Sequence, residues 1–272
     1  MKSHLIRLAT LVALAGFIVS CATSPTGRRQ FLLNDETQMS AMGAAAFQEI
    51  RQGSTRSTNS GQTAYVRCVA SAIISGLTAE DMRSVSVAQW EVELFQDESA
   101  NAFALPGGKI GVHTGLLNVA TNQDQLATVL GHEVGHVLAR HSNERASQEM
   151  GAQTIMQAGA VFLGAGTPAQ QQMMGILGAG VQYGILMPYG RTQESESDEI
   201  GLLLMARAGF DPRQSIPLWQ NMGASSGGQA PPEFMSTHPS HATRIAQLQG
   251  WLSDAMPLYQ QAQAAGRRPN CR

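Results

Sequence analysis

Apolar residues spaced three and four positions apart predict that the second half of the chain is mostly helical. Within residues 122–141, for example, Leu126, Leu130, Val134 and Val137 fall on one face of such a helix. Two helices are also expected nearer the start of the chain. The predicted helices cover residues 35–51, 63–74, 115–120, 122–141, 142–162, 168–187, 192–208, 212–222 and 239–256.

Strand signals are concentrated in one part of the chain. Residues 85–95 are rich in valine, residues 101–105 have extended character, and residues 109–113 alternate in polarity after a Pro-Gly-Gly turn. A small sheet among many helices predicts an α+β fold. No linker is long enough or biased enough in composition to separate two units, so residues 21–272 are expected to form a single domain.

Composition narrows the classes of function. The 272 residues and the 43% hydrophobic content suffice for a folded core, and the formal net charge of -2 provides no basic surface for nucleic acid. One stretch is unusual, because residues 150–190 contain no charged side chain. Two interpretations stay open for it: a pair of buried helices, or a mobile, methionine-rich apolar flap that contacts unfolded polypeptide.

The first twenty residues have the pattern of an export signal. Positive charges at Lys2 and Arg7 precede an apolar run over residues 8–19, which is shorter than the roughly 20 residues that a membrane-spanning helix needs. The four residues that end at Cys21 resemble a bacterial lipobox, whose cysteine is acylated and becomes the mature N-terminus. The alternative is an ordinary cleaved signal beside an incidental cysteine.

The lipobox resemblance implies a location. Lipoproteins of this kind carry Asp after the cysteine when they stay in the inner membrane, whereas Ala22 follows Cys21 here. The resemblance therefore implies a lipid anchor in the outer membrane of a bacterium, with the protein facing the periplasm. Acylation of Cys21 leaves Cys68 and Cys271, and an oxidising compartment favours a disulfide between them over two free thiols.

An HExxH motif, formed by His132, Glu133 and His136, lies within the helix predicted for residues 122–141. At about 100° per residue, positions four apart differ by about 40°, so both imidazoles can bind one ion while Glu133 faces the same cleft. The pattern is typical of zinc peptidases, in which the glutamate is the general base. The alternative is a pair of histidines with a structural role.

A catalytic zinc needs a third protein ligand. The metzincin continuation HExxHxxGxxH is excluded, because Ala139 and Ser142 occupy the positions of its glycine and third histidine. His141 is one residue away from that position and would point away from the other two histidines. It is therefore interpreted as a helix-end residue.

An acidic segment supplies the remaining candidates. Glu194 and Asp198 are four residues apart, so they fall on one face of the helix predicted for residues 192–208. One carboxylate can then bind the metal while the other steadies a metal ligand. Glu196 points to the other side. Without the HExxH motif, the same segment would be interpreted as a solvated helix start.

These motifs, together with STHPSHATRI near the C-terminus, resemble the gluzincin family of zinc metallopeptidases, which includes the CAAX prenyl protease, HtpX and the mitochondrial overlapping-activity protease. The lipobox, SPTGRRQF and NAFALPGG are similar to its bacterial lipoprotein branch, with LoiP and BepA as relatives. The resemblance covers nearly all of the mature chain. It implies a mostly helical zincin-like domain that binds one Zn²⁺.

The resemblance also implies roles for individual residues. The implied zinc ligands are His132, His136 and Glu194, with Glu133 as the general base. His238 would either stabilise the transition state or bind zinc as an extra ligand, and the sequence leaves both alternatives open. The implied supporting residues are Asp198 and Arg244, and the implied substrate-binding edge strand contains Asn101, Ala102, Phe103 and Ala104.

The function implied by the resemblance is a membrane-anchored endopeptidase for quality control. Its substrates would be misfolded or stalled envelope proteins, and outer-membrane assembly machinery would be a further partner. The alternative is a zinc-bearing chaperone or assembly factor for outer-membrane proteins, whose site is held closed by His238.

Overall fold

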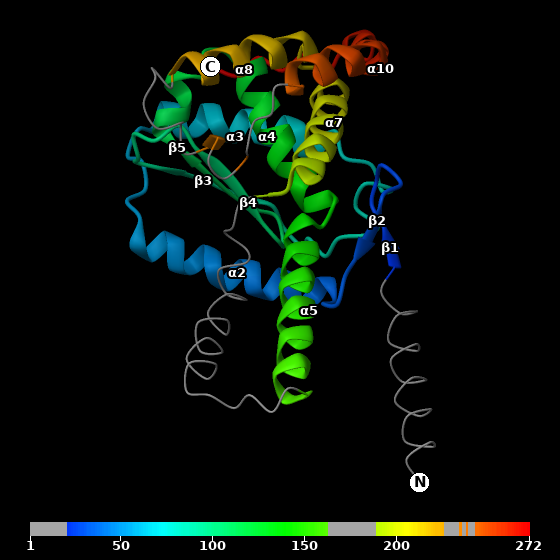
Figure 1. Cartoon of the computed structure of the whole chain (residues 1–272). Coiled ribbons are helices and arrows are strands. Elements are labelled where there is room, and N and C mark those ends of the chain that lie inside the picture. The colour runs from blue at the N-terminus through cyan, green and yellow to red at the C-terminus, as the bar shows by residue number, and fades with distance from the viewer. Residues whose placement is uncertain (1–20, 163–188, 226–233, 236–237, 239–242) are drawn as a thin grey trace.

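The computed structural model describes residues 21–162, 189–225, 234–235, 238 and 243–272. The predicted export signal and the helix over residues 168–187 lie outside the described residues, as does most of the uncharged stretch. Within the described residues the chain is α+β and mostly helical, which confirms the predicted fold class (Figure 1). No helix among them is both long enough and apolar enough to cross a bilayer.

The elements are, in chain order, β1 (Cys21–Thr23), β2 (Arg29–Phe31), α2 (Glu36–Gly53), α3 (Ser60–Ser75), β3 (Glu91–Phe95), β4 (Ala102–Leu105), β5 (Lys109–His113), η1 (Thr114–Asn118), α4 (Gln123–Leu138), α5 (His141–Phe162), α7 (Arg191–Ala208), η2 (Pro212–Gln214), α8 (Ser215–Ser225) and α10 (Arg244–Ala264).

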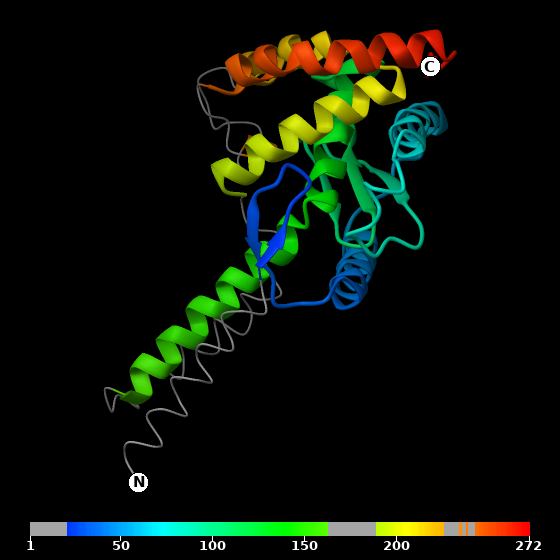
Figure 2. The same cartoon turned by 90° about the vertical axis from the view of Figure 1, so that its right-hand side faces the viewer.

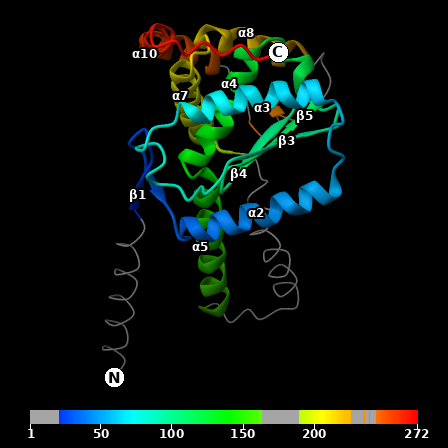
Figure 3. The same ribbon diagram turned by 180° about the vertical axis from the view of Figure 1, so that it is seen from behind.

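The larger sheet lies between two layers of helices. Its central strand β5 pairs in parallel with β3 and antiparallel with β4, so β4 is an edge strand. α2 covers one face, and α3 and α4 cover the other (Figures 1 and 3). Phe103 and Leu105 of β4 pack with Phe47 of α2. Ala102 and Ala104 point the opposite way and join the main core, because side chains alternate along a strand.

Glycines let α4 and α7 cross at short range. A Cβ on Gly131 would come within 2.8 Å of the Gly201 carbonyl oxygen, and one on Gly201 would come within 2.6 Å of the His132 nitrogen. A Cβ on Gly135 would lie 3.0 Å from the Ser197 carbonyl oxygen. The two backbones therefore touch where any larger side chain would separate them. This crossing places the HExxH face of α4 against the carboxylates of α7.

A hairpin that the sequence does not predict lies at the start of the described residues. β1 and β2 pair antiparallel, and Gly27 adopts the left-handed backbone (φ 88°) that the connecting turn requires. Figure 2 shows the hairpin beside α7 and the start of α5. Its strands have three residues each, which is too short for a recognisable alternation of polar and apolar positions.

The boundary between two predicted helices lies earlier in the structure than the sequence predicts. α4 ends at Leu138, Arg140 takes a left-handed backbone with φ 55°, and α5 begins at His141. The prediction of a continuous helix over residues 122–141 is therefore wrong at its last turn. The break matters for the site, because it reorients the ring of His141.

Smaller differences have local causes. The predicted helix over residues 115–120 is a 3-10 helix, and the one over residues 212–222 begins as a 3-10 turn at Pro212. Residues 85–90 form bends and irregular backbone instead of extending β3. The apolar side chains of Val87 and Trp90 pack closely against the turn at Gly108.

The structure contains the disulfide between Cys68 and Cys271 that the sequence predicts. The bond joins α3 to the C-terminal tail across 203 positions of sequence, with the two Cα atoms 5.6 Å apart. In the chain-entropy model, closing a loop of that length is worth about 5 kcal/mol. Gln123 of α4 also binds the tail, because its side chain donates to the Pro269 carbonyl and accepts from the Cys271 amide, both at 2.9 Å.

Candidate metal centre

Four buried side chains converge where α4 and α7 cross. His132 and His136 come from α4, Glu194 comes from α7, and His238 comes from the chain that precedes α10. One ligand atom from each lies within 4.8 Å of the other three. None of these residues is more than 2% exposed, so the cluster is shielded from solvent.

The spacing of the ligand atoms fits a tetrahedral zinc site. His132 Nε2 lies 3.0 Å from His136 Nε2. Glu194 Oε1 lies 3.3 Å from His136 Nε2, and Glu194 Oε2 lies 3.5 Å from His132 Nε2. Ligands bound about 2.0 to 2.1 Å from one zinc ion stand roughly 3.3 Å apart. The buried Glu194 Oε1 also has no hydrogen-bond donor among the described residues. A cation would satisfy this oxygen, so the residues fit zinc.

Asp198 and Arg244 support the ligands from behind. Asp198 accepts a hydrogen bond from His132 Nδ1 at 2.9 Å, which leaves the Nε2 lone pair of His132 for a metal. Arg244 Nε donates to Asp198 at 2.5 Å, and Arg244 Nη2 donates to Glu194 Oε2 at 3.0 Å. Burial raises the pKa of Asp198, but the charge of Arg244 and the contact with His132 outweigh burial and bring this pKa below its ordinary value.

Glu133 lies beside the cluster, fully buried. Burial and then the negative charge of Glu194 raise the pKa of Glu133 well above its ordinary range. Burial also raises the pKa of Glu194, to about 8, although the charge of Arg244 opposes the rise. Two neighbouring buried carboxylates resist simultaneous ionisation unless a cation joins them, which again fits a metal site.

His238 reaches the cluster through aromatic packing. Its backbone amide donates to the Phe234 carbonyl at 2.8 Å, and the two rings stack with centroids 4.4 Å apart. His238 Nε2 then lies 3.4 Å from Glu133 Oε1. The side chain is thus close to both the general-base candidate and the metal ligands.

The edge strand β4 also reaches Glu133. His113 of β5 donates to the Asn101 carbonyl, and the alternation of an antiparallel ladder then directs the backbone groups of Ala102 and Ala104 away from β5. Consistent with this, the Ala104 amide faces the Glu133 carboxylate and acts to lower the pKa of Glu133. Of the predicted substrate-binding residues, Ala102 and Ala104 therefore have backbone groups that face away from β5, whereas the backbone groups of Asn101 and Phe103 face β5.

His141 lies at a helix end, as expected, because α5 begins there, but the expectation that its side chain points away from the other histidines is wrong. Its ring is fully buried, and its Nδ1 lies 2.9 Å from His136 Nδ1. Glu196 faces away from the cluster, as expected, but it is only 5% exposed and lies 3.0 Å from His141 Nε2. The helix break at Arg140 causes the difference, because a continuous helix would have carried His141 around to another face.

Sequence reasoning also missed an aromatic contact with His136. The Tyr189 ring stacks on the His136 imidazole with centroids 3.7 Å apart. The guanidinium carbon of Arg145 lies 3.7 Å from the centroid of the Tyr189 ring. Tyr189 directly precedes the first turn of α7 in a segment with no motif. Nothing in the sequence pattern distinguishes it.

Comparisons with known proteins agree with this geometry. Residues 60–252 match peptidase family M48. The mitochondrial metalloendopeptidase OMA1 of Schizosaccharomyces pombe is 38% identical over 71% of this chain and 54% of its own. Human OMA1 is 33% identical over 66% of this chain and 35% of its own. The beta-barrel assembly-enhancing protease of Escherichia coli is 30% identical over 62% of this chain and 36% of its own.

The relatives correct one prediction and support another. Six of them, 32 to 38% identical, are mitochondrial, which contradicts the predicted location on a bacterial outer membrane. The chain spans about half or less of the length of these relatives. The family match covers most of the chain, and the buried histidine and glutamate cluster supplies the ligands that the chemistry of this family needs. The chain belongs to peptidase family M48.

Proposed function

We propose that this chain is a zinc-dependent metallopeptidase that cleaves internal bonds of unfolded or misfolded polypeptides, which bind along β4 as an added strand. The observation that carries the proposal is the outward direction of the Ala102 and Ala104 backbone groups on the edge strand β4, where the Ala104 amide faces the Glu133 carboxylate and favours its charged form. It puts the outer edge of the sheet in contact with the general-base candidate. Strand addition recognises the main chain more than side chains, so it suits substrates that are unfolded and varied in sequence.

The chain's own residues divide the work of hydrolysis. When bound by His132, His136 and Glu194, zinc supplies a Lewis acid and lowers the pKa of water toward about 7. Glu133 takes the proton of the attacking water and delivers it to the leaving amine. A carboxylate suits this task, because it can hold the proton between the two transfers.

His238 has two roles that the geometry permits. It can donate a hydrogen bond to the substrate carbonyl oxygen as negative charge develops there, or it can bind zinc as a fourth protein ligand. Its inclusion within the 4.8 Å cluster favours the second role in the resting protein. A zinc ion with four protein ligands lacks the open position that catalysis needs.

This closed arrangement supports a second candidate function, a zinc-bearing chaperone that holds unfolded chains without cutting them. Casein cleavage by the wild-type protein and by His238→Ala separates the two. If the protein is a chaperone whose zinc site is closed by His238, the wild-type protein does not cleave casein and the His238→Ala variant does. A peptidase that uses His238 in the transition state cleaves as wild type and loses activity in that variant.

Peptides with single backbone N-methyl groups test the binding mode. Methyl groups at alternate positions of a substrate fall toward β4 or away from it, because strand backbone groups alternate in direction. We expect every second methyl group to abolish cleavage and the intervening ones to be tolerated. Uniform tolerance would refute strand addition. Glu133→Gln serves as the inactive control and is expected to retain zinc.

Anchoring at the membrane stays a prediction. Acylation of Cys21 predicts a mature chain that starts at this residue and carries fatty acids. Mass spectrometry of the purified protein measures both features directly. A mature chain that begins elsewhere, or an unmodified Cys21, would refute the lipid anchor and leave the peptidase proposal untouched.

A further inference from the structure

The two histidine ligands are supported in different ways. His132 Nδ1 contacts the carboxylate of Asp198, which is a common arrangement behind metal-binding histidines. His136 Nδ1 instead contacts a second imidazole, that of His141, at 2.9 Å. A carboxylate can only accept a hydrogen bond, but an imidazole can donate or accept. The support of His136 therefore depends on what fixes the tautomer of His141.

Glu196 fixes that tautomer. Its carboxylate accepts from His141 Nε2 at 3.0 Å, so the His141 proton resides on Nε2 and the Nδ1 atom is left as an acceptor. His136 Nδ1 then donates to His141 Nδ1, and the Nε2 lone pair of His136 faces the metal cluster. The Ser197 hydroxyl, 3.2 Å from His141 Nδ1, can donate to the same acceptor.

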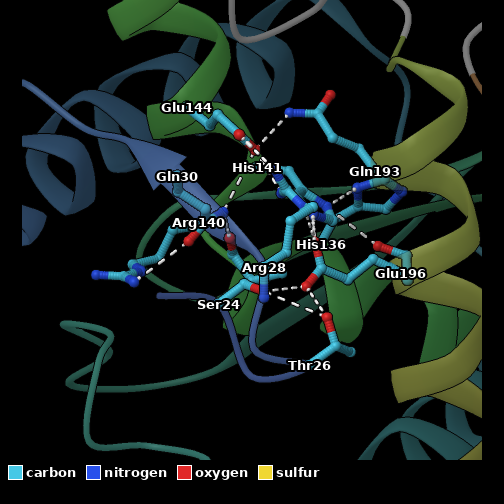
Figure 4. Close-up of polar contacts among 12 residues, drawn as sticks. Ser24, Thr26, Arg28, Gln30, His136, Arg140, His141, Glu144, Gln193 and Glu196 are labelled. Atoms are coloured by element: carbon cyan, nitrogen blue, oxygen red, sulfur yellow. Dashed lines mark hydrogen bonds and ion pairs between the residues drawn. The ribbon is translucent and has the colours of Figure 1, made fainter. Parts of the chain in front are cut away.

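The hairpin holds Glu196 in place (Figure 4). The hydroxyls of Ser24 and Thr26 donate to Glu196 Oε1, and Arg28 Nε donates to Glu196 Oε2 at 2.8 Å. Together with His141, four donors from two distant parts of the sequence converge on one carboxylate that is 5% exposed. They lower the pKa of Glu196 far below its ordinary value, against the effect of burial.

Further contacts attach the hairpin to the same region. The Arg28 guanidinium binds Glu144 of α5 through two hydrogen bonds of 2.6 and 2.7 Å. Gln30 Nε2 donates to the Ala139 carbonyl at 2.6 Å, next to the helix break. Arg140 Nη2 donates to the Thr23 carbonyl at 2.9 Å. The hairpin is thereby connected to both helices on either side of His141.

We infer that the N-terminal hairpin, residues 21–31, is a working part of the zinc centre, because it holds Glu196, and through it His141, as positioning residues for the zinc ligand His136. The inference rests on the zinc site of the proposed function. It has a specific consequence. A substitution in the hairpin that contacts no zinc ligand should increase the rate at which zinc dissociates. Outer partners of metal ligands typically contribute about 10- to 100-fold to metal affinity.

The test compares neighbouring arginines in the full chain. Arg28→Gln removes the donor to Glu196, whereas Arg29→Gln changes an exposed hairpin residue whose side chain has no hydrogen bond or ion pair among the described contacts. Zinc transfer to a chromogenic chelator measures the rate of metal loss. We expect Arg28→Gln to lose zinc about 10- to 100-fold faster than wild type, and Arg29→Gln to match wild type.

A second pair of variants tests the imidazole relay. His141→Leu removes the acceptor for His136, whereas the amide oxygen of His141→Asn can stand near the place of Nδ1 and restore it. Visible spectra of the cobalt-substituted proteins report ligand geometry, which a role in overall stability alone would not alter. We expect an altered spectrum and fast metal loss for His141→Leu, and recovery toward wild type for His141→Asn.

The outcomes are decisive in both directions. If Arg28→Gln folds and keeps the wild-type rate of zinc loss, the inference is wrong, whether or not His141→Leu folds. If the wild-type chain binds no zinc, the proposed function fails as well. Cleavage of casein by wild type with unchanged metal retention in Arg28→Gln would refute only the role of the hairpin.

Discussion

Replacing Gly201 with alanine should push α4 and α7 apart at the zinc ligands. The new Cβ would lie 2.6 Å from the His132 nitrogen, 2.7 Å from the Gly131 carbonyl carbon and 2.9 Å from the His132 Cα. All three are backbone atoms, which cannot move aside by rotating a side chain. Ordinary contacts between such atoms measure about 3.5 to 4.0 Å, so the helices must separate by roughly 1 Å.

The expected cost follows from this displacement. Overpacking a core costs about 1 to 3 kcal/mol, which for a chain of this size lowers Tm by roughly 2 to 12 °C. Glu194 and Asp198 move with α7, so the carboxylates also shift relative to His132. We therefore expect zinc to bind at least about 10-fold more weakly, as when supporting contacts of a ligand are lost.

Gly250→Ala is the matched control. Gly250 lies within α10, and nothing stands within 4 Å of the position that its Cβ would take. Alanine there should stabilise the helix by about 0.5 to 1 kcal/mol. Differential scanning fluorimetry and zinc titration of both variants make the comparison. Wild-type Tm and zinc affinity in Gly201→Ala would show that the close crossing does not hold the site together.

Three further predictions concern the ligands and the disulfide. Because the pKa of Glu194 is raised to about 8, zinc uptake by the metal-free protein at pH 7 should release protons, and affinity should rise with pH and level off above about 8. Calorimetry in buffers of different ionisation enthalpy measures this, and zero release at pH 7 would contradict the assignment. Asp198→Asn should weaken zinc binding about 10- to 100-fold while Asp254→Asn, on the outer helix α10, has no effect in the same titration. Replacing both Cys68 and Cys271 with serine should cost about 2 to 5 kcal/mol in urea unfolding, and an unchanged midpoint would mean that the bond adds no stability.

Much of the site could be predicted from the sequence because its parts obey local geometry. His132 and His136 are four residues apart on one helix, and so are Glu194 and Asp198 on another. Helical periodicity alone aligns each pair. The motif near the C-terminus added His238 and Arg244 through resemblance, and the structure brings both to the cluster.

The contacts that the sequence could not predict are those between distant segments. Nothing local joins Arg28 to Glu196, or Tyr189 to His136, and these pairs depend on how α5, α7 and the hairpin pack. His141 was misplaced for a related reason. One residue with a left-handed backbone, Arg140, redirects the chain, and such a conformation leaves no reliable mark on a non-glycine position.

The sequence by itself determined the HExxH pair and the α+β class through residue type and short-range spacing, and the cysteine pair through the number of cysteines. Tertiary structure alone decided three other features: the position of β4 relative to Glu133, the glycine-lined crossing that joins the two ligand pairs, and the attachment of the hairpin to Glu196. These depend on packing between elements far apart in the chain, where the pattern of any one segment carries no information about its partner.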